Sequence, residues 1–233
     1  RYRDWGTLKY WFRGVEKYAP WVNKVYFISD NQIPEWMNTE CAKLQIVDHK
    51  DYIPSEYLPT FSSHPIELNM HRINGLSEKF VYFNDDLFLT KPVDETIFFR
   101  NGKPCDNPIL SPIIMEGKSS IGKVCANNMG VINTYFTKSN VIRHKRKWYS
   151  LKYGKKLLRS FFLTPWHHLT GFYNDHLPQP FLKSTFETVW EKEPELLKEV
   201  SSHKFRDNDR DVSQWLFRYW QFCEENFEPI SPN

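Results

Sequence analysis

The sequence predicts an α/β protein with a Rossmann-like open, mostly parallel sheet, helices on both faces and a helical C-terminal part. Two observations lead to this prediction. Short apolar runs of strand length alternate with helix-spaced apolar residues over about the first hundred positions, and beyond about residue 105 the strand-like pattern fades. With 233 residues, of which 40% are hydrophobic and 17% aromatic, the chain can bury one sizeable core.

The expected elements follow from local signals. Asp4 is a plausible N-cap, and apolar residues then recur at helical spacing until a proline stops the pattern. Each strand-like run is closed by polar residues that are typical of turns. In chain order, the expected elements are a helix from Asp4 to Pro20, strands at 24–29 and 44–48, a helix from Ser62 to Gly75, and a strand at 80–83.

A basic segment stands out in the second half of the chain. From Arg143 to Arg159 the sequence holds eight Lys or Arg, and apolar residues mark a stripe at helical spacing, which predicts a basic amphipathic helix or helix pair. The pattern favours a solvated charged face above a packed stripe. The alternatives are peripheral contact with an anionic membrane surface or with a charged glycan. The stripe consists of Trp148, Leu151, Leu158 and Phe162.

The remainder of the chain is predicted to be mostly helical. Pro178 and Pro180 frame a loop, and helical spacing then resumes over 183–200. An amphipathic run at 212–222 closes the pattern.

Composition excludes several classes of protein. The four cysteines are widely spaced and form no C-x-x-C pair, which argues against a disulfide framework or a zinc site and favours a reducing compartment. No run reaches the roughly 18 apolar residues of a membrane span. A net charge of +3 is too mild to imply nucleic acid, although it allows an anionic substrate.

Three polar residues follow the third predicted strand directly: Asn84, Asp85 and Asp86. In open α/β sheets, ligands bind beyond the carboxyl ends of strands. Two adjacent carboxylates repel each other, and a divalent cation with phosphate oxygens on its far side would relieve that repulsion. Oxygen ligands suit Mg²⁺ or Mn²⁺. The alternative is a plain turn, in which Asn and Asp are common.

Two blocks of sequence carry a family resemblance. "RYRDWGTLKYWFRGVEKYAPWVNKVYFISDNQIPEWM" and "LPTFSSHPIELNMHRINGLSEKFVYFNDDLFL", within residues 1–100, resemble the long conserved block of the Stealth family of sugar-phosphate transferases. That family includes bacterial capsule and exopolysaccharide phosphotransferases and the GlcNAc-1-phosphotransferase of lysosomal targeting. "HLPQPFLKSTFETVW" and "KFRDNDRDVSQWLFRYW" resemble its next region in the bacterial form.

The resemblance also implies missing parts. Family members carry an earlier T-W-V-D-like strand motif and a later motif with an N-D pair, and neither occurs here. We therefore expect the chain to be a fragment of one catalytic unit. Residues 1–115 would form its nucleotide-sugar-binding α/β part, and 116–233 a mostly helical part that completes the cleft.

The implied reaction is transfer of a hexose 1-phosphate, such as GlcNAc-1-phosphate from UDP-GlcNAc, to a glycan hydroxyl during capsular or exopolysaccharide synthesis. The expected location is the bacterial cytoplasm, and a peripheral position at the inner face of the membrane is the alternative. One alternative is a metal-dependent glycosyltransferase, which would release a nucleoside diphosphate. Another is a noncatalytic glycan-binding module.

The resemblance also assigns roles to residues. His176 matches the family's H-x-P histidine and would be the general base, for which His167 and His168 compete. Arg206 would hold phosphoryl oxygens in its planar fork. Asp85 and Asp86 would bind the metal and diphosphate, with Asp86 also counted as catalytic and Asn84 shaping the loop. Residues expected to line the nucleotide-sugar cleft are Arg3, Asp4, His71, Arg72 and Asn84.

Overall fold

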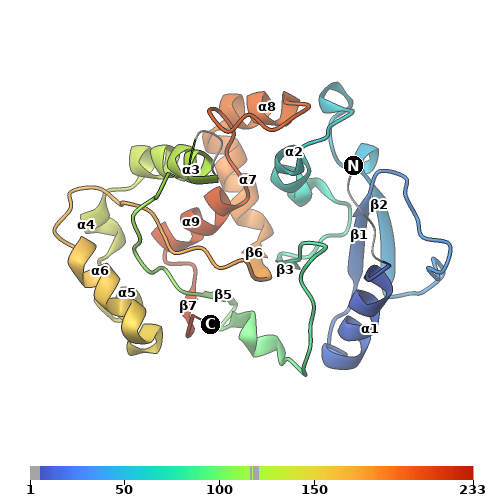
Figure 1. The fold of residues 1–233 in the computed structure, drawn as a ribbon, viewed down its shortest axis with the longest axis horizontal. Helices are drawn as coiled ribbons and strands as arrows, with labels where there is room; N and C mark the ends of the chain where they lie inside the picture. Colours follow the sequence, from blue (N-terminus) through green and yellow to red (C-terminus); the bar gives the residue numbers. More distant parts are fainter. Residues whose placement is uncertain (1–5, 116, 118–120, 233) are drawn as a thin grey trace.

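The computed structural model describes residues 6–115, 117 and 121–232. They form a mixed α/β protein with small sheets and a mostly helical C-terminal part. Figure 1 shows α1, β1 and β2 at one end of the molecule and α4, α5 and α6 at the other, with β3, β6 and helices α2, α7, α8 and α9 between them.

Strands β1 (Val25–Ser29) and β2 (Leu44–Asp48) lie close to their expected positions and pair in parallel. Helix α1 (Leu8–Tyr18) packs on this pair through Phe12, whose ring contacts Phe27 edge-on. The helix begins later than expected, after Thr7, because Gly6 has a φ of +63° that a right-handed helix cannot accommodate. Asp4, the expected cap, lies outside the described residues.

The expected single open sheet is not confirmed. Strand β3 (Lys79–Tyr82) pairs with β6 (Gln179–Leu182) in antiparallel register, rather than extending the β1–β2 pair. The sequence predicts a loop framed by Pro178 and Pro180, where the structure has the start of β6. Pro180 lies opposite Val81 in an edge strand, where a residue without a backbone N–H is tolerated. A third sheet has the order β4 (Phe99–Arg100), β5 (Lys103–Asp106), β7 (Glu228–Pro229), with β5 and β7 parallel.

Helix α2 (Ser63–Leu68) begins where the sequence predicted, with the Ser62 hydroxyl accepting the His64 amide. It ends well before Gly75. The Asn69 side chain donates to the carbonyl of Pro65, a local bond that competes with helix continuation, and a 3₁₀ turn follows. The 3₁₀ turns of this part of the chain are η1 (His49–Asp51), η2 (Ser55–Tyr57), η3 (Met70–Arg72) and η4 (Glu95–Ile97).

The main core lies between the C-terminal helices and the β3–β6 pair. Phe186 of α7 stacks on Phe217 of α9 with ring centroids 3.7 Å apart, and both side chains are fully buried. Helix α9 is buried on all sides, so it is a core helix rather than the amphipathic one expected. The helices around this core are α3 (Ile121–Tyr135), α7 (Lys183–Lys192), α8 (Pro194–Ser202) and α9 (Trp215–Cys223).

The basic segment forms a broken pair of helices. Gly154, with a φ of +53°, interrupts it. Trp148 is buried, but Leu151, Leu158 and Phe162 are 89%, 59% and 76% exposed, so the predicted packed stripe is wrong. Helical spacing shows that residues share a face and does not show which way the face points. The elements here are α4 (Lys138–Val141), α5 (Lys145–Trp148), η5 (Leu151–Lys156) and α6 (Leu157–Leu163).

Candidate active site

The three polar residues after β3 form a turn. The carbonyl of Asn84 accepts a hydrogen bond from the Leu87 amide at 3.3 Å, and the Asp85 and Asp86 side chains are exposed. The local geometry is therefore the turn that Asn and Asp favour, and it presents two carboxylates at the end of a strand. These two interpretations are compatible, because a turn is a suitable place to expose ligands.

His176 contacts Asp86, although 90 residues separate them. Its Nε2 lies 3.1 Å from Oδ2 and 3.2 Å from Oδ1 of Asp86. The β3–β6 ladder explains the contact: Tyr82, at the end of β3, is paired with Gln179, at the start of β6. Antiparallel pairing thus places the turn after β3 beside the loop that precedes β6. The structure brings two predicted site residues together.

Arg206 lies at the start of α2. Its Nη2 donates to the Ser63 hydroxyl at 2.9 Å, and its guanidinium group is exposed. The charge of Arg206 is also one of the influences that lower the pKa of Glu67 on the same helix. An exposed guanidinium with one bond to a hydroxyl keeps donors available for an oxyanion.

Glu67 is a site residue that the sequence analysis did not identify. Its carboxyl is buried, Oε1 accepts a hydrogen bond from the Tyr82 hydroxyl at 3.0 Å, and Oε2 has no partner among the described residues. Burial raises the pKa of Glu67, against the opposing effects of His64, Tyr82, Ser63 and Arg206. Burial likewise raises the pKa of Tyr82, with the charges of Glu67 and Asp85 adding to the effect.

Glu67 therefore links the two halves of the candidate site. The charge of Arg206 lowers its pKa, and Tyr82, whose own pKa is raised in part by Asp85, donates a hydrogen bond to it. The sequence offered little signal for this role, because an acid in the first turns of a helix is ordinary.

A buried carboxylate holds the segment that carries Arg206. Asp211 is fully buried, and it accepts hydrogen bonds from His64 Nδ1 at 2.8 Å, His203 Nδ1 at 2.7 Å and the Asp207 amide at 2.9 Å. Burial alone would raise the pKa of Asp211, but these donors outweigh it and the pKa lies below its usual value. Asp211 thus ties α2 to the loop that positions Arg206.

The structure does not join His71 and Arg72 to this cluster. His71 is buried against Phe186 and Trp190, and burial, aided by Arg72, lowers its pKa to about 4, so the side chain is neutral at pH 7. Arg72 lies over the Trp190 ring at 4.6 Å. Their role in substrate binding stays a prediction. Arg3 and Asp4 lie outside the described residues.

A crevice opens at the carboxyl ends of the parallel strands β1 and β2. Asp30 follows β1, Asp48 ends β2, and His49 comes next along the chain. The pKa of His49 is lowered by burial, against the charges of Asp30 and Asp48. Leu58, Pro59 and Thr60 also line the crevice, and they belong to the segment that leads directly to Ser63 and α2.

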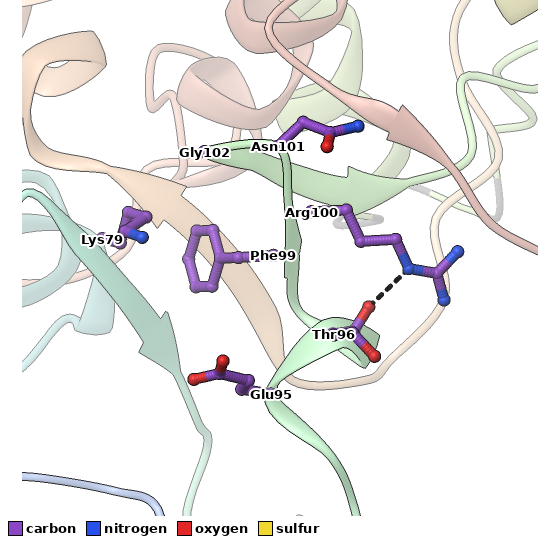
Figure 2. A pocket seen from close by; sticks show the side chains of 7 residues that line it. All are labelled: Lys79, Glu95, Thr96, Phe99, Arg100, Asn101 and Gly102. Carbon is purple, nitrogen blue, oxygen red and sulfur yellow. Dashed lines mark hydrogen bonds between the residues drawn. The ribbon is translucent and has the colours of Figure 1, made fainter.

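A second hollow lies at the opposite end of β3 from the carboxylate turn. Lys79 begins β3 and faces Phe99, with Glu95 below them (Figure 2). The Arg100 Nε donates to the Thr96 carbonyl at 2.8 Å, so the Arg100 side chain lies against the turn at Glu95–Ile97. None of the predicted site residues lines this hollow.

Comparison with known proteins identifies the family. A model of Stealth protein CR2, conserved region 2, matches residues 1–106. The chain is 46% identical to a capsular polysaccharide phosphotransferase, WcwK, of Streptococcus pneumoniae, over 100% of this chain and 69% of the relative. It belongs to the Stealth family. The family resemblance is thus confirmed, and this Stealth chain is a transferase enzyme.

Two other similar proteins are also polysaccharide phosphotransferases. The Stealth chain is 46% identical to a receptor polysaccharide phosphotransferase, WefC, of Streptococcus oralis, over 99% of this chain and 69% of the relative. It is 42% identical to an exopolysaccharide phosphotransferase, cps2G, of Lactiplantibacillus plantarum, over 100% of this chain and 68% of the relative. The chain thus spans about two thirds of the length of these proteins.

The carboxylates of Asp85 and Asp86 have the chemistry to hold a cation together with the phosphate groups of a substrate. Within residues 6–115, 117 and 121–232, no group of three or more His, Cys, Asp or Glu side chains is arranged to hold a metal ion by itself. Mg²⁺ is commonly held by only one or two carboxylates, together with waters and substrate phosphates, and Asp85 and Asp86 present such a pair at an exposed turn. Asp85 and Asp86 therefore stay the predicted ligands.

If His176 is the predicted general base, His176→Ala should lower turnover about a hundredfold while the affinity for the predicted nucleotide-sugar donor changes little, because a base acts on the acceptor and not on the donor. Turnover and calorimetric binding of the donor measure the two effects. His144→Ala is the matched control, since His144 is also exposed and is not a candidate base. Full activity of His176→Ala, with activity lost in His167→Ala or His168→Ala, would move the base to that residue.

Proposed function

We propose that this Stealth enzyme transfers a hexose 1-phosphate, such as GlcNAc-1-phosphate, from a nucleotide diphosphate sugar to a glycan hydroxyl in capsular or exopolysaccharide synthesis. The observation that supports this most is the contact of His176 with Asp86. Acceptor activation and phosphate binding are the two tasks that such a transfer requires.

The geometry suggests how His176 works. With Nε2 turned to the Asp86 carboxylate, an Nε2–H donates to it and Nδ1 keeps its lone pair. Nδ1 would then take the proton of the acceptor hydroxyl. The acceptor oxygen bonds to the sugar-side phosphorus as the bond from that phosphorus to the bridging oxygen breaks. The products are a phosphodiester and a nucleoside monophosphate. Asp86 stabilises the imidazolium that forms.

Arg206 would bind the equatorial oxygens of the transferring phosphoryl group, since its fork matches two oxygens at once. Mg²⁺ or Mn²⁺ bound by Asp85 and Asp86 would neutralise charge on the diphosphate. The nucleotide part of the donor would occupy the crevice at the ends of β1 and β2, which adjoins the segment leading to Ser63. Ligands in α/β proteins favour this position.

We also propose that the enzyme works in the bacterial cytoplasm. Cys41, Cys105, Cys125 and Cys223 are all free thiols, which suits a reducing compartment.

The leaving nucleotide tests the proposal. Incubating the enzyme with UDP-GlcNAc, Mg²⁺ and a capsule-like glycan should release UMP, measured by anion exchange, with a phosphodiester signal in phosphorus NMR of the polymer. Asp86→Asn serves as the inactive control. UDP released in proportion to acceptor would instead establish a glycosyltransferase, because attack at the anomeric carbon leaves the nucleoside diphosphate intact.

A further inference from the structure

The surface of α5, η5 and α6 together with the turn after them, residues 143–166, exposes large apolar side chains. We call it the α5–α6 surface. Five apolar residues of this short segment are each more than half exposed, although such residues are usually buried. They are Leu151, Leu158, Phe161, Phe162 and Trp166.

The exposed residues of α6 form one face of the helix. Leu158 and Phe162 are four positions apart and so lie on the same side, while Leu157 and Ser160 are buried on the other side. Figure 1 shows that α5 and α6 lie at the extremity of the molecule, at the opposite end from α1. The apolar face therefore points away from the core of the described structure.

Positive charge accompanies this apolar face. Residues 143–174 include eight Lys or Arg and no Asp or Glu. Some of these charges turn inward, since Lys147 pairs with Glu228 and Lys152 donates to the Pro229 carbonyl. His144 pairs with Glu225. The basic residues that remain exposed include Arg143, Lys145, Arg146 and Lys155.

We propose that the α5–α6 surface docks the protein on an anionic lipid bilayer. Phenylalanine, tryptophan and leucine beside Lys and Arg are the composition of segments that lie in the membrane interface, with the apolar groups at the headgroup boundary and the cations on lipid phosphates. No helix of the described residues is long and apolar enough to cross a bilayer, so the contact is peripheral.

A bilayer explains more of the surface than a charged glycan does. A polyanionic glycan would satisfy the cations but would leave the Leu158 and Phe162 face in water. The docking proposal depends only on this surface, and it holds or fails independently of the proposed reaction.

The surface also lies close to the candidate active site along the chain. Lys156 lies 3.8 Å from the centre of the Tyr173 ring, and Arg159 lies 5.8 Å from it. Three residues after Tyr173 comes His176. The segment that leads to the proposed base is thus in contact with the docking surface.

Sedimentation with vesicles tests the proposal. Wild-type protein should bind vesicles of phosphatidylcholine and phosphatidylglycerol, with little binding to phosphatidylcholine alone and weaker binding at high salt. The Leu158→Ser/Phe162→Ser variant should lose about tenfold in affinity, because two apolar side chains no longer enter the interface. Tyr10→Ser, an exposed aromatic at the opposite end of the molecule, is the matched control and should bind like wild type.

Charge reversal provides the second arm. Lys145→Glu/Arg146→Glu should lower the affinity for anionic vesicles by about tenfold or more, whereas Lys9→Glu/Lys17→Glu on α1 should not.

Three outcomes would overturn the proposal of membrane docking. One is unchanged vesicle binding in Leu158→Ser/Phe162→Ser. Another is binding to a soluble anionic polysaccharide that charge reversal alone abolishes. The third is a large fall in melting temperature for Leu158→Ser/Phe162→Ser with vesicle binding retained, which would mean that another protein segment covers this face.

Discussion

Asp86→Asn should lower turnover at least about a hundredfold while the circular dichroism spectrum stays native. The amide removes the negative charge that faces His176 Nε2 and that would stabilise the imidazolium formed during proton transfer. The change would also weaken binding of the proposed Mg²⁺ or Mn²⁺, whose charge would neutralise the diphosphate. Steady-state kinetics with UDP-GlcNAc and a glycan acceptor measure the effect.

Two further variants sharpen this test. Asp85→Asn separates the roles of the two carboxylates, since the observed contact with His176 is made by Asp86. Glu16→Gln on α1, also an exposed carboxylate, is the matched control and should retain full activity. Normal turnover of Asp86→Asn with a native spectrum would leave the Asn84–Leu87 turn as a structural feature only.

Asp211→Ala should destabilise the folded protein by about 3–5 kcal/mol, the usual cost of removing one partner from a buried charged network. The change leaves His64, His203 and the Asp207 amide without their acceptor. Urea unfolding measures the loss. Asp209→Ala is the control: this carboxylate is 72% exposed and pairs with Lys123 at the surface, so about 1 kcal/mol or less is expected.

The stability contributed by the Asp211 network should also depend on pH. Because the folded-state pKa of Asp211 lies below its unfolded value of about 3.9, the carboxylate stabilises the fold above that pH and loses this contribution as the pH falls through the folded-state pKa. Asp211→Asn, which keeps the shape of the side chain, should therefore show a smaller fall in melting temperature between neutral pH and pH 3 than wild type. Equal falls in both proteins would show that Asp211 does not titrate with unfolding.

The sequence predicted the strand β3 and the polar turn after it because both signals are local. The contact of Asp86 with His176 could not be predicted, since it depends on β6, whose prolines indicated a loop. Glu67 and Asp211 were missed for a different reason. What distinguishes them is burial together with donors that come from distant segments, and a carboxylate in the sequence carries no sign of either.

The error at the α5–α6 surface has a similar origin. The spacing of Leu151, Leu158 and Phe162 indicated a shared helical face, and a packed face was the simpler explanation. Gly154 breaks the helix, so one helical repeat does not run through the segment, and Leu151 before the break and Leu158 and Phe162 after it face outward although Trp148 is buried.

The four residue pairs that join β3 and β6 determine where insertions and deletions in this chain can be tolerated. The pairing of Lys79–Tyr82 with Gln179–Leu182, together with the short turn and loop next to it, brings Asp86 and His176 together. Insertions and deletions in the solvent-facing connections between these strands should therefore leave the spacing of the pair intact. A shift of the ladder by one residue, in contrast, would turn alternate side chains to the opposite face and separate them. Exposed turns between the two strands can thus change in length while Asp86 and His176 keep their spacing.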